Sequence, residues 1–303
     1  MRTMQEYKAQ FEALSAMALA ELLPEEKASV TFSAESSAFM RFNGCKVRQG
    51  GTVEQASLGM KLFRGAKSFA FQIGLSGRES EDAERLAAAL GEARVTMGLL
   101  PDDPYQAVPD AADASESIHP GKLPAPADIP AKVLAPAAGL DFTGIYSQGC
   151  MCRGAANSAG ARHWFATETF LVDYSAWLPN GRAVKSSYAG REWNDAEYAK
   201  RLDATRMALG NLEKPEVALK PGNYRAFVTA DALNEVVVFF SWDGLGERGI
   251  RQGESAYLAL KEGRESFSPK FGLTQDFGLG VEPAFNENGE KAPDKLTLIE
   301  GGK

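Results

Sequence analysis

Histidine and cysteine are scarce in this sequence. Its 303 residues include two histidines, His119 and His163, and three cysteines, Cys45, Cys150 and Cys152. A catalytic zinc site built on a helix needs two histidines on one helix face and a third ligand. Because 43 residues separate His119 from His163, the chain cannot build such a site by itself. A small, odd number of cysteines is typical of reduced thiols and indicates a reducing compartment.

Long apolar runs and basic tracts are also missing. No segment reaches the ~18 consecutive apolar residues of a membrane helix, and Met1–Leu23 lacks the apolar core and cleavage site of a signal peptide. The net charge is −7, from 33 Lys and Arg against 40 Asp and Glu. Since binding to a phosphate backbone depends on Lys and Arg, we expect no nucleic-acid partner, no membrane partner and a cytoplasmic location.

The first hundred residues alternate between helical and strand patterns. Apolar residues from Met4 to Leu22 recur at helical spacing and predict a helix that ends before Pro24. Strand patterns then predict an antiparallel meander over 28–75, with hairpin turns at Gly50-Gly51 and Gly65-Ala66. A second helix is expected from Ser80, its N-cap, to about Met97. Residues 1–100 are therefore predicted to form an α+β domain, ordered helix, antiparallel meander, helix.

Prolines mark the next segment. Eight of the 15 prolines fall between residues 101 and 138, among many Asp, Ala and Ser. Such a composition is typical of a linker or a meandering surface segment. We therefore predict a proline-rich linker over 101–138 and a domain boundary there.

A second α+β domain is predicted over 139–280. Aromatic and β-branched residues indicate long antiparallel strands over 142–152, 161–177 and 182–193, and Asn194 then opens a helix. A short strand is expected over 224–229. The following helix, from Ala232 to about Trp242 with Asp231 as its cap, is apolar on most faces, which predicts burial in the core or in a partner interface.

Several short motifs follow one another in order along the chain. In the first region they are Ser37–Asn43, Val47–Gly50 and Val53–Gln55. In the second region they are Ala156–Arg162, Thr167–Thr169, Arg182–Gly190, Leu219–Tyr224 and Phe267–Pro269. Near the end, Pro283–Gly289 is followed by Leu298–Gly301. In this order the motifs resemble the TldD/PmbA (TldE) family.

The resemblance implies a metallopeptidase family that acts on unfolded peptides. TldD-type members carry a His-Glu-x-x-x-His helix that binds zinc, whereas TldE-type members lack it and pair with a TldD-type subunit. In this chain the corresponding helix has no histidine. One register places Asn234, Glu235 and Phe239 on the motif positions, and another places Ala230 and Asp231 there.

The chain is therefore expected to be a TldE-like, non-catalytic subunit of a complex for peptide maturation and degradation. It would be inactive on its own and hold no cofactor, and zinc would belong to the TldD-type partner. A homo- or hetero-oligomer is expected. The alternative is a stand-alone peptide-binding or assembly protein. Residues 281–303 resemble the start of the family's C-terminal domain, and a natural end and a truncation at Lys303 both stay open.

The resemblance also implies a peptide- or partner-binding role for the residues after the first long strand of the second region. These are Asn157, Ser158, Gly160 and Arg162. Residues of these types also mark turns and bulges, and both interpretations stay open.

Three other chemistries are weaker interpretations. Cys150-x-Cys152 could form half of a metal site, although ordinary thiols on a strand explain it more simply. Ser158, His163 and Asp173 could form a nucleophile triad, but no nucleophile elbow surrounds Ser158. The glycines between Gly244 and Gly253 lack the Lys-Ser/Thr pair of a phosphate-binding loop.

Overall fold

The computed structural model describes residues 2–242 and 244–303 and divides into two compact units. The first unit extends to Glu213 and also contains Leu279–Ala292. The second unit comprises Lys214–Gly278 and Pro293–Lys303. The predicted boundaries at residues 100 and 138 therefore fall inside the first unit, whereas the one at residue 280 lies close to the division between Gly278 and Leu279.

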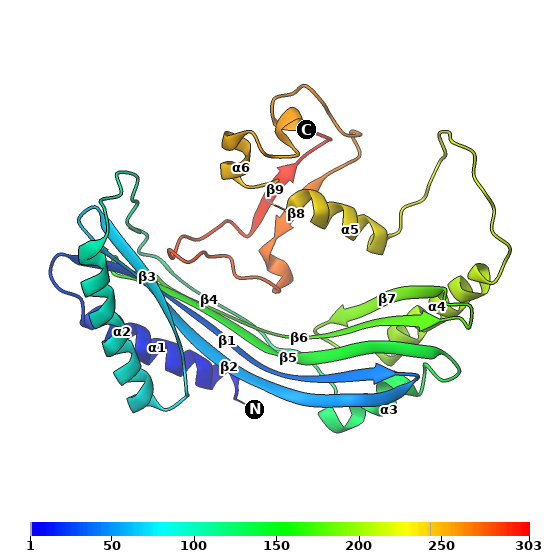
Figure 1. Ribbon diagram of the computed structural model, residues 1–303, viewed down its shortest axis with the longest axis horizontal. Helices are drawn as coiled ribbons and strands as arrows, with labels where there is room; N and C mark the ends of the chain where they lie inside the picture. Colours follow the sequence, from blue (N-terminus) through cyan, green and yellow to red (C-terminus); the bar gives the residue numbers. More distant parts are fainter. Residues whose placement is uncertain (1, 243) are drawn as a thin grey trace. The chain divides into compact units, whose positions relative to one another are not determined.

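The first unit is built on one seven-stranded sheet (Figure 1). Its strands follow the order β3-β2-β1-β5-β6-β4, and β7 also pairs with β6. All pairs are antiparallel except β4 with β6. The strands are β1 (Glu26–Asn43), β2 (Lys46–Arg64), β3 (Lys67–Gly74), β4 (Ala114–His119), β5 (Asp141–Asn157), β6 (Arg162–Trp177) and β7 (Ala183–Gly190). The predicted α+β class is confirmed.

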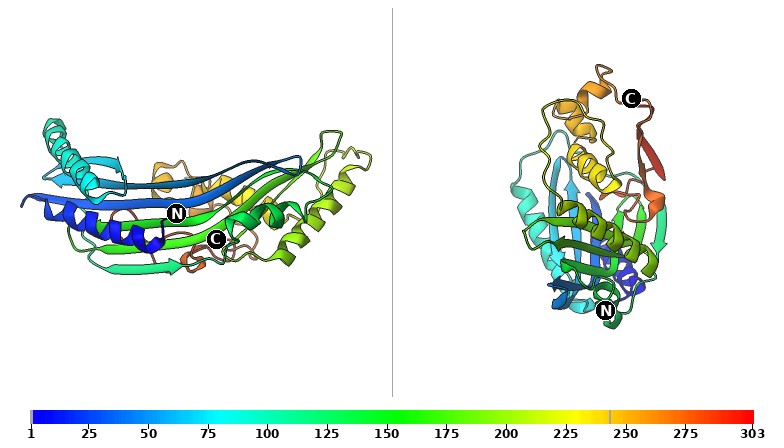
Figure 2. Two further views of the ribbon diagram at one scale, coloured as in Figure 1. Left: turned by 90° about the horizontal axis from the view of Figure 1, so that it is seen from below. Right: turned by 90° about the vertical axis from the view of Figure 1, so that its right-hand side faces the viewer.

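The helices of this unit cover one face of the sheet (Figures 1 and 2). The even-numbered residues of β1, including Val30, Phe32 and Ala34, are buried against α1 and α2, and Phe42 belongs to the cluster around α3 and α4. Since side chains alternate between the faces of a strand, the odd-numbered residues lie on the other face. The helices are α1 (Met4–Ala20), α2 (Glu79–Leu99), the 3₁₀ turn η1 (Pro126–Asp128), α3 (Ile129–Leu134) and α4 (Asp195–Leu212).

The first hairpin turn lies at Gly44-Cys45, not at the predicted Gly50-Gly51. Gly44 and Cys45 both have φ of 56°, the left-handed conformation that a two-residue turn requires. Gly50 and Gly51 instead pair with Met40 and Phe39 inside the long β1–β2 ladder. The second predicted turn, at Gly65-Ala66, is confirmed between β2 and β3.

The proline-rich segment is not a linker. Its β4 adds a parallel strand to β6, and Ile129 and Val133 of α3 are buried in the core. The sheet is also continuous between the two predicted α+β domains, because β1 pairs with β5 along most of its length. Prolines here restrict the loops around short elements that pack on one continuous sheet.

Helix ends match the sequence signals in part. Asn194 caps α4, and its side chain accepts hydrogen bonds from the backbone amides of Ala196 and Glu197. The second helix begins at Glu79, so Ser80 lies within its first turn and not at its cap.

The second unit contains short elements around a two-stranded sheet. Residues 224–229, all of which are described, form no strand, contrary to the prediction. Thr229, and not Asp231, caps α5 by accepting a hydrogen bond from Ala232. The elements are α5 (Ala230–Ser241), α6 (Glu247–Gln252), α7 (Leu258–Lys261), β8 (Leu273–Asp276), the 3₁₀ turn η2 (Phe277–Leu279) and β9 (Lys295–Ile299).

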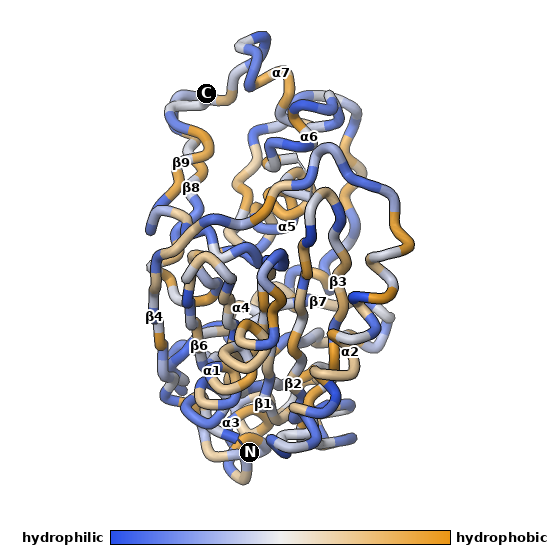
Figure 3. The backbone as a smooth tube through the Cα atoms, turned by 90° about the vertical axis from the view of Figure 1, so that its left-hand side faces the viewer, coloured by the Kyte–Doolittle hydropathy of each residue, from blue (hydrophilic) through white to orange (hydrophobic). Residues whose placement is uncertain are grey.

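The predicted burial of the apolar helix in the core is not observed, and its burial in a partner interface stays a prediction. Every residue of α5 is described and none is buried, and the Phe239 side chain is 73% exposed. Figure 3 shows the hydrophobic residues of this helix in orange. Among the described residues, no helix combines the length and apolar content that a bilayer crossing requires.

Candidate functional site

The face of the sheet opposite α1–α4 is polar near its centre, and we call it the polar face. It presents alternate residues of neighbouring strands. Arg153 of β5 lies opposite Ser33 of β1, and Ser33 lies opposite Ser57 of β2. Glu35 and Gln55 form the next pair in this row, joined by a hydrogen bond of 2.9 Å from Gln55 Nε2 to a Glu35 carboxylate oxygen.

A hairpin formed by residues 283–292 packs on this face. Its two arms are joined by the Ala292 N to Ala284 O hydrogen bond of 2.8 Å. The Phe285 ring stacks on the His163 ring with their centroids 5.2 Å apart. Gly289 O accepts a hydrogen bond of 3.0 Å from His163 Nε2. Side chains of the sheet therefore hold this hairpin in place.

Two adjoining cavities lie on the polar face, and the hairpin lines one of them. One, of about 270 Å³, is lined by β1, β2, β3, β5 and the hairpin residues Pro283, Phe285, Asn286 and Glu287. The other, of about 600 Å³, continues along the same strands. Four polar residues line both cavities, namely Ser33, Ser57, Gln72 and Arg153. Their combined size suits a ligand as large as a short peptide segment.

Both histidines are occupied by structural contacts. His163 is buried, and its Nδ1 lies 2.8 Å from Ser115 Oγ. Its Nε2 bonds the Gly289 carbonyl, so neighbouring groups of the first unit engage both ring nitrogens. His119 Nε2 lies 2.7 Å from Ser117 Oγ. Burial, with a smaller contribution from Arg191, lowers the pKa of His119.

The predicted binding residues meet at the turn between β5 and β6, where three of them have structural roles. Asn157 is buried, and its Oδ1 accepts hydrogen bonds from three backbone amides of that turn. Ser158 Oγ accepts a hydrogen bond of 3.1 Å from Ala28 N. Gly160 has φ of 121°, which favours glycine. Arg162 is exposed at the start of β6, and a binding role for these residues stays a prediction.

The positions predicted for the lost zinc motif all lie on α5. Asp231, Asn234, Glu235 and Phe239 are exposed there, and the helix has no histidine. Over the ranges 2–242 and 244–303, no three His, Cys, Asp or Glu side chains are arranged to hold a metal ion. The residues that the structure describes therefore do not fit a catalytic zinc site.

The positions of the side chains decide two of the weaker interpretations, the cysteine metal site and the nucleophile triad. Cys150 and Cys152 are buried on the same face as α1. The neighbouring Cys152 thiol lowers the pKa of Cys150, and the Cys150 thiol together with burial raises the pKa of Cys152. Asp173 lies ten residues beyond His163 on β6, about 33 Å along the strand. Ser158, His163 and Asp173 therefore form no triad.

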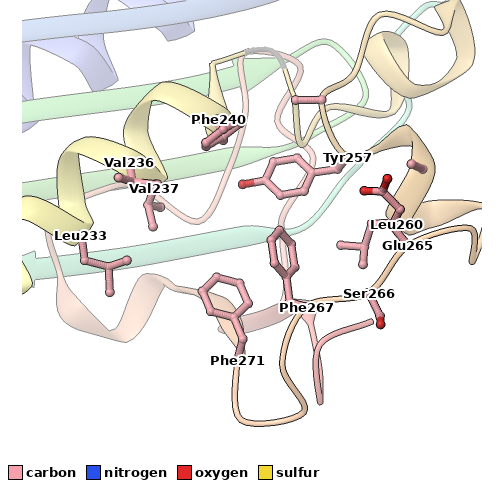
Figure 4. Close-up of a pocket in the computed structure, with 12 residues that line it drawn as sticks. Leu233, Val236, Val237, Phe240, Tyr257, Leu260, Glu265, Ser266, Phe267 and Phe271 are labelled. Carbon is pink, nitrogen blue, oxygen red and sulfur yellow. The ribbon is translucent and has the colours of Figure 1, made fainter. Parts of the chain in front are cut away.

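An apolar pocket of about 310 Å³ lies within the second unit (Figure 4). The pocket lies between two sets of apolar side chains. One set comes from α5 and comprises Leu233, Val237 and Phe240; the set across from it comprises Tyr257, Phe267 and Phe271. The Tyr257 and Phe267 rings are 6.3 Å apart, centroid to centroid. These contacts give α5 a partial core inside its own unit, while its other side stays exposed.

Sequence comparison and structure comparison give different results. No protein-family model matches the chain, and no curated protein sequence matches it. TldE from Thermococcus kodakarensis is similar in structure, with a TM-score of 0.62, 12% identity, and 98% of this chain and 68% of that chain covered. The chain has the fold of TldE.

Two further solved structures share the TldE fold of this chain. One is a proposed modulator of DNA gyrase from Thermotoga maritima, with a TM-score of 0.68, 15% identity, and coverage of 99% of this chain and 69% of that chain. The other is a proposed modulator of DNA gyrase from Bacteroides thetaiotaomicron, with a TM-score of 0.69, 14% identity, and coverage of 97% and 70%. The fold implied by the motif order is confirmed.

The sequence interpretation missed the polar cavities of this TldE-like fold. Arg153 and Gln72 had not been singled out, and the hairpin 283–292 had been assigned to a separate domain. The alternation in β1 carried a usable signal, because Thr31, Ser33, Glu35 and Ser37 are polar at every second position. That pattern marks a strand face that is polar and accessible.

Proposed function

We propose that this chain is a TldE-like, non-catalytic subunit of a TldD/TldE-type metallopeptidase complex that matures and degrades unfolded peptides. One observation carries the proposal. The fold matches TldE over 98% of the chain, whereas α5, the counterpart of the zinc helix implied by the motif order, has no histidine.

The remaining features agree with a subunit that needs a partner. Both histidines of the chain bind other parts of the first unit, so neither is available as a zinc ligand. The exposed apolar side chains of α5 and its C-cap form a surface that a partner protein would cover, and they include Val238, Phe239 and Trp242. The edge strand β3 has one unpaired side along which an extended peptide could add as a further strand.

The isolated chain is expected to cleave no unfolded peptide, with or without added zinc. It lacks the zinc ligands that activate water in this type of peptidase. Hydrolysis of a fluorogenic unstructured peptide, measured before and after chelation, checks this expectation. Metal-dependent turnover that co-elutes with the chain through two unrelated purification steps would contradict the proposal.

The alternative, a stand-alone peptide-binding or assembly protein, predicts a different result in one experiment. The chain and a TldD-type protein from the same organism are co-expressed, with a tag on this chain alone. Co-purification in a fixed ratio supports the subunit role. A stable homodimer that excludes the TldD-type protein supports the alternative.

A further inference from the structure

We propose that the two adjoining cavities of the polar face, one of them lined by the hairpin 283–292, bind the free C-terminal carboxylate of an extended peptide, with Arg153 as the carboxylate ligand. The peptide as ligand class rests on the function proposed above, but the site itself belongs to the isolated chain. Its residues all lie in the first unit.

Arg153 has unused hydrogen-bonding capacity. A guanidinium group carries five N–H donors. In the described part of the chain, the hydrogen bond of this side chain is from Nη1 to Cys152 O, at 2.9 Å. Among the described residues that line the two cavities, Arg153 is the one cationic side chain. Arginine binds a carboxylate through two parallel N–H···O bonds, which a carboxyl terminus can accept.

The neighbours of Arg153 are polar and also unpaired. No hydrogen bond joins the Ser33, Ser57 or Gln72 side chain to any described residue. Ser33 lies opposite both Arg153 and Ser57, and directly opposed side chains in a sheet have Cβ atoms about 5 Å apart. This row can therefore donate to a carboxylate at Arg153 and to the peptide groups that precede it.

The acidic residues nearby do not neutralise Arg153. Glu35 accepts hydrogen bonds from Ser37 and Gln55, and Glu54 accepts one from Arg2 N. Glu287 is exposed on the hairpin. None of the ion pairs among the described residues includes Arg153. An anionic group brought by a ligand would complete the site.

The floor of the site depends on a glycine. Gly59 lines the smaller cavity, and a Cβ atom at this position would lie 2.5 Å from Thr31 Oγ1. A side chain there would displace Thr31 or fill the space next to Gln72, which lies opposite Gly59 on β3. The absence of a side chain at Gly59 therefore leaves space in the smaller cavity for the bound peptide.

The test compares three N-acetylated, unstructured peptides of alanine, glycine and serine. One has a free C-terminus, one is C-terminally amidated, and one is amidated with a single internal glutamate. Isothermal titration with the purified chain is expected to show about tenfold tighter binding of the free acid, the size typical of a charge-assisted bidentate contact. Equal affinity for the free-acid peptide and the plain amidated peptide would overturn the proposal. So would equal affinity for the free-acid peptide and the amidated glutamate peptide, because any carboxylate would then suffice.

Variants assign the effect to the arginine. Arg153→Gln is expected to remove the preference for the free acid, and Arg153→Lys to retain a reduced preference because the charge stays while the bidentate geometry is lost. Arg248→Gln, which removes the same charge from an exposed position on α6, should retain the full preference. Loss of the preference in Arg248→Gln, or its survival in a folded Arg153→Gln, would contradict the assignment. The isolated chain is used throughout, so failure here is separable from failure to pair with a TldD-type subunit.

Discussion

Replacing Asn157 with alanine is expected to lower the free energy of unfolding by about 3 kcal/mol, because the change leaves several buried polar groups without partners. The side chain accepts bonds from the amides of Ala159, Gly160 and Ala161. Its Nδ2 donates to Ala111 O at 2.9 Å and to Asn288 O at 3.0 Å. One residue therefore joins the β5–β6 turn, the segment before β4 and the hairpin 283–292. Urea denaturation followed by circular dichroism measures the loss.

Asn180→Ala is the matched control. Asn180 is exposed in the turn before β7, and its side chain accepts one bond, from Arg182 N. Its replacement should cost about 1 kcal/mol or less. If both alanine variants lose the same stability, Asn157 does not join these three segments.

Asn157→Asp separates the two roles of the side chain. Aspartate keeps the acceptor for the turn amides but loses the amide donor to Ala111 O and Asn288 O. Amide hydrogen exchange in residues 284–292 is therefore expected to accelerate, while exchange at Gly160 and Ala161 changes less. Uniform acceleration at both places would show that the hairpin does not depend on the Nδ2 contact.

Replacing Arg94 with methionine is expected to cost about 2–4 kcal/mol at neutral pH, because it leaves a buried carboxylate without its partner. The Glu26 side chain is fully buried, and Arg94 is 25% exposed. The guanidinium bonds the carboxylate through Nε at 3.0 Å and Nη2 at 2.9 Å. Arg78→Met is the control, because both side chains of the Arg78–Glu81 ion pair are exposed. Exposed ion pairs contribute about 0–1 kcal/mol to the free energy of unfolding.

The pH dependence of this pair follows from the direction of the Glu26 pKa. Burial raises the pKa of Glu26, but the hydrogen bonds from Arg94 and Leu23 N outweigh it, so the net pKa is lowered below 4.5. In the native chain, this group contributes stability that is fully present above pH 4.5 and is lost as the pH falls through the lower folded-state pKa. In Arg94→Met the Glu26 carboxylate loses the hydrogen bonds from Arg94. The difference in unfolding free energy between the native chain and this variant should therefore shrink on acidification. A difference that stays constant as the pH falls from 7 to well below 4.5 would contradict this account.

Local sequence patterns predicted much of the fold. The periodicity of Met4–Leu22 predicted α1, and the alternation through Phe32 and Leu58 predicted strands, because local spacing determines which face of an element is apolar. The proline-rich segment misled the prediction, because composition does not show that Ile129 and Val133 enter the core. Burial of α5 in the core was wrong for a related reason, since the composition of an apolar helix does not show which surface covers it, and burial in a partner interface stays a prediction.

The site was harder to predict than the fold because its contacts connect distant parts of the sequence. Asn157 looked like a turn residue, and its bonds to the β5–β6 turn have that character. Its bond to Asn288 joins residues 131 positions apart, which no local pattern encodes. Arg153 likewise becomes part of a site only because the sheet places it next to Ser33 and Ser57. These two residues belong to strands about a hundred residues earlier in the sequence.

The proposed role is tested most directly by reconstitution with a TldD-type subunit. Hydrolysis of an unfolded peptide is measured with this chain alone, the TldD-type subunit alone and an equimolar mixture, all with zinc. The subunit proposal predicts no hydrolysis by this chain alone and strong hydrolysis by the mixture, abolished when the partner's zinc-helix histidines are replaced. Zinc-dependent hydrolysis by this chain alone, or no difference between the mixture and the partner alone, would contradict it.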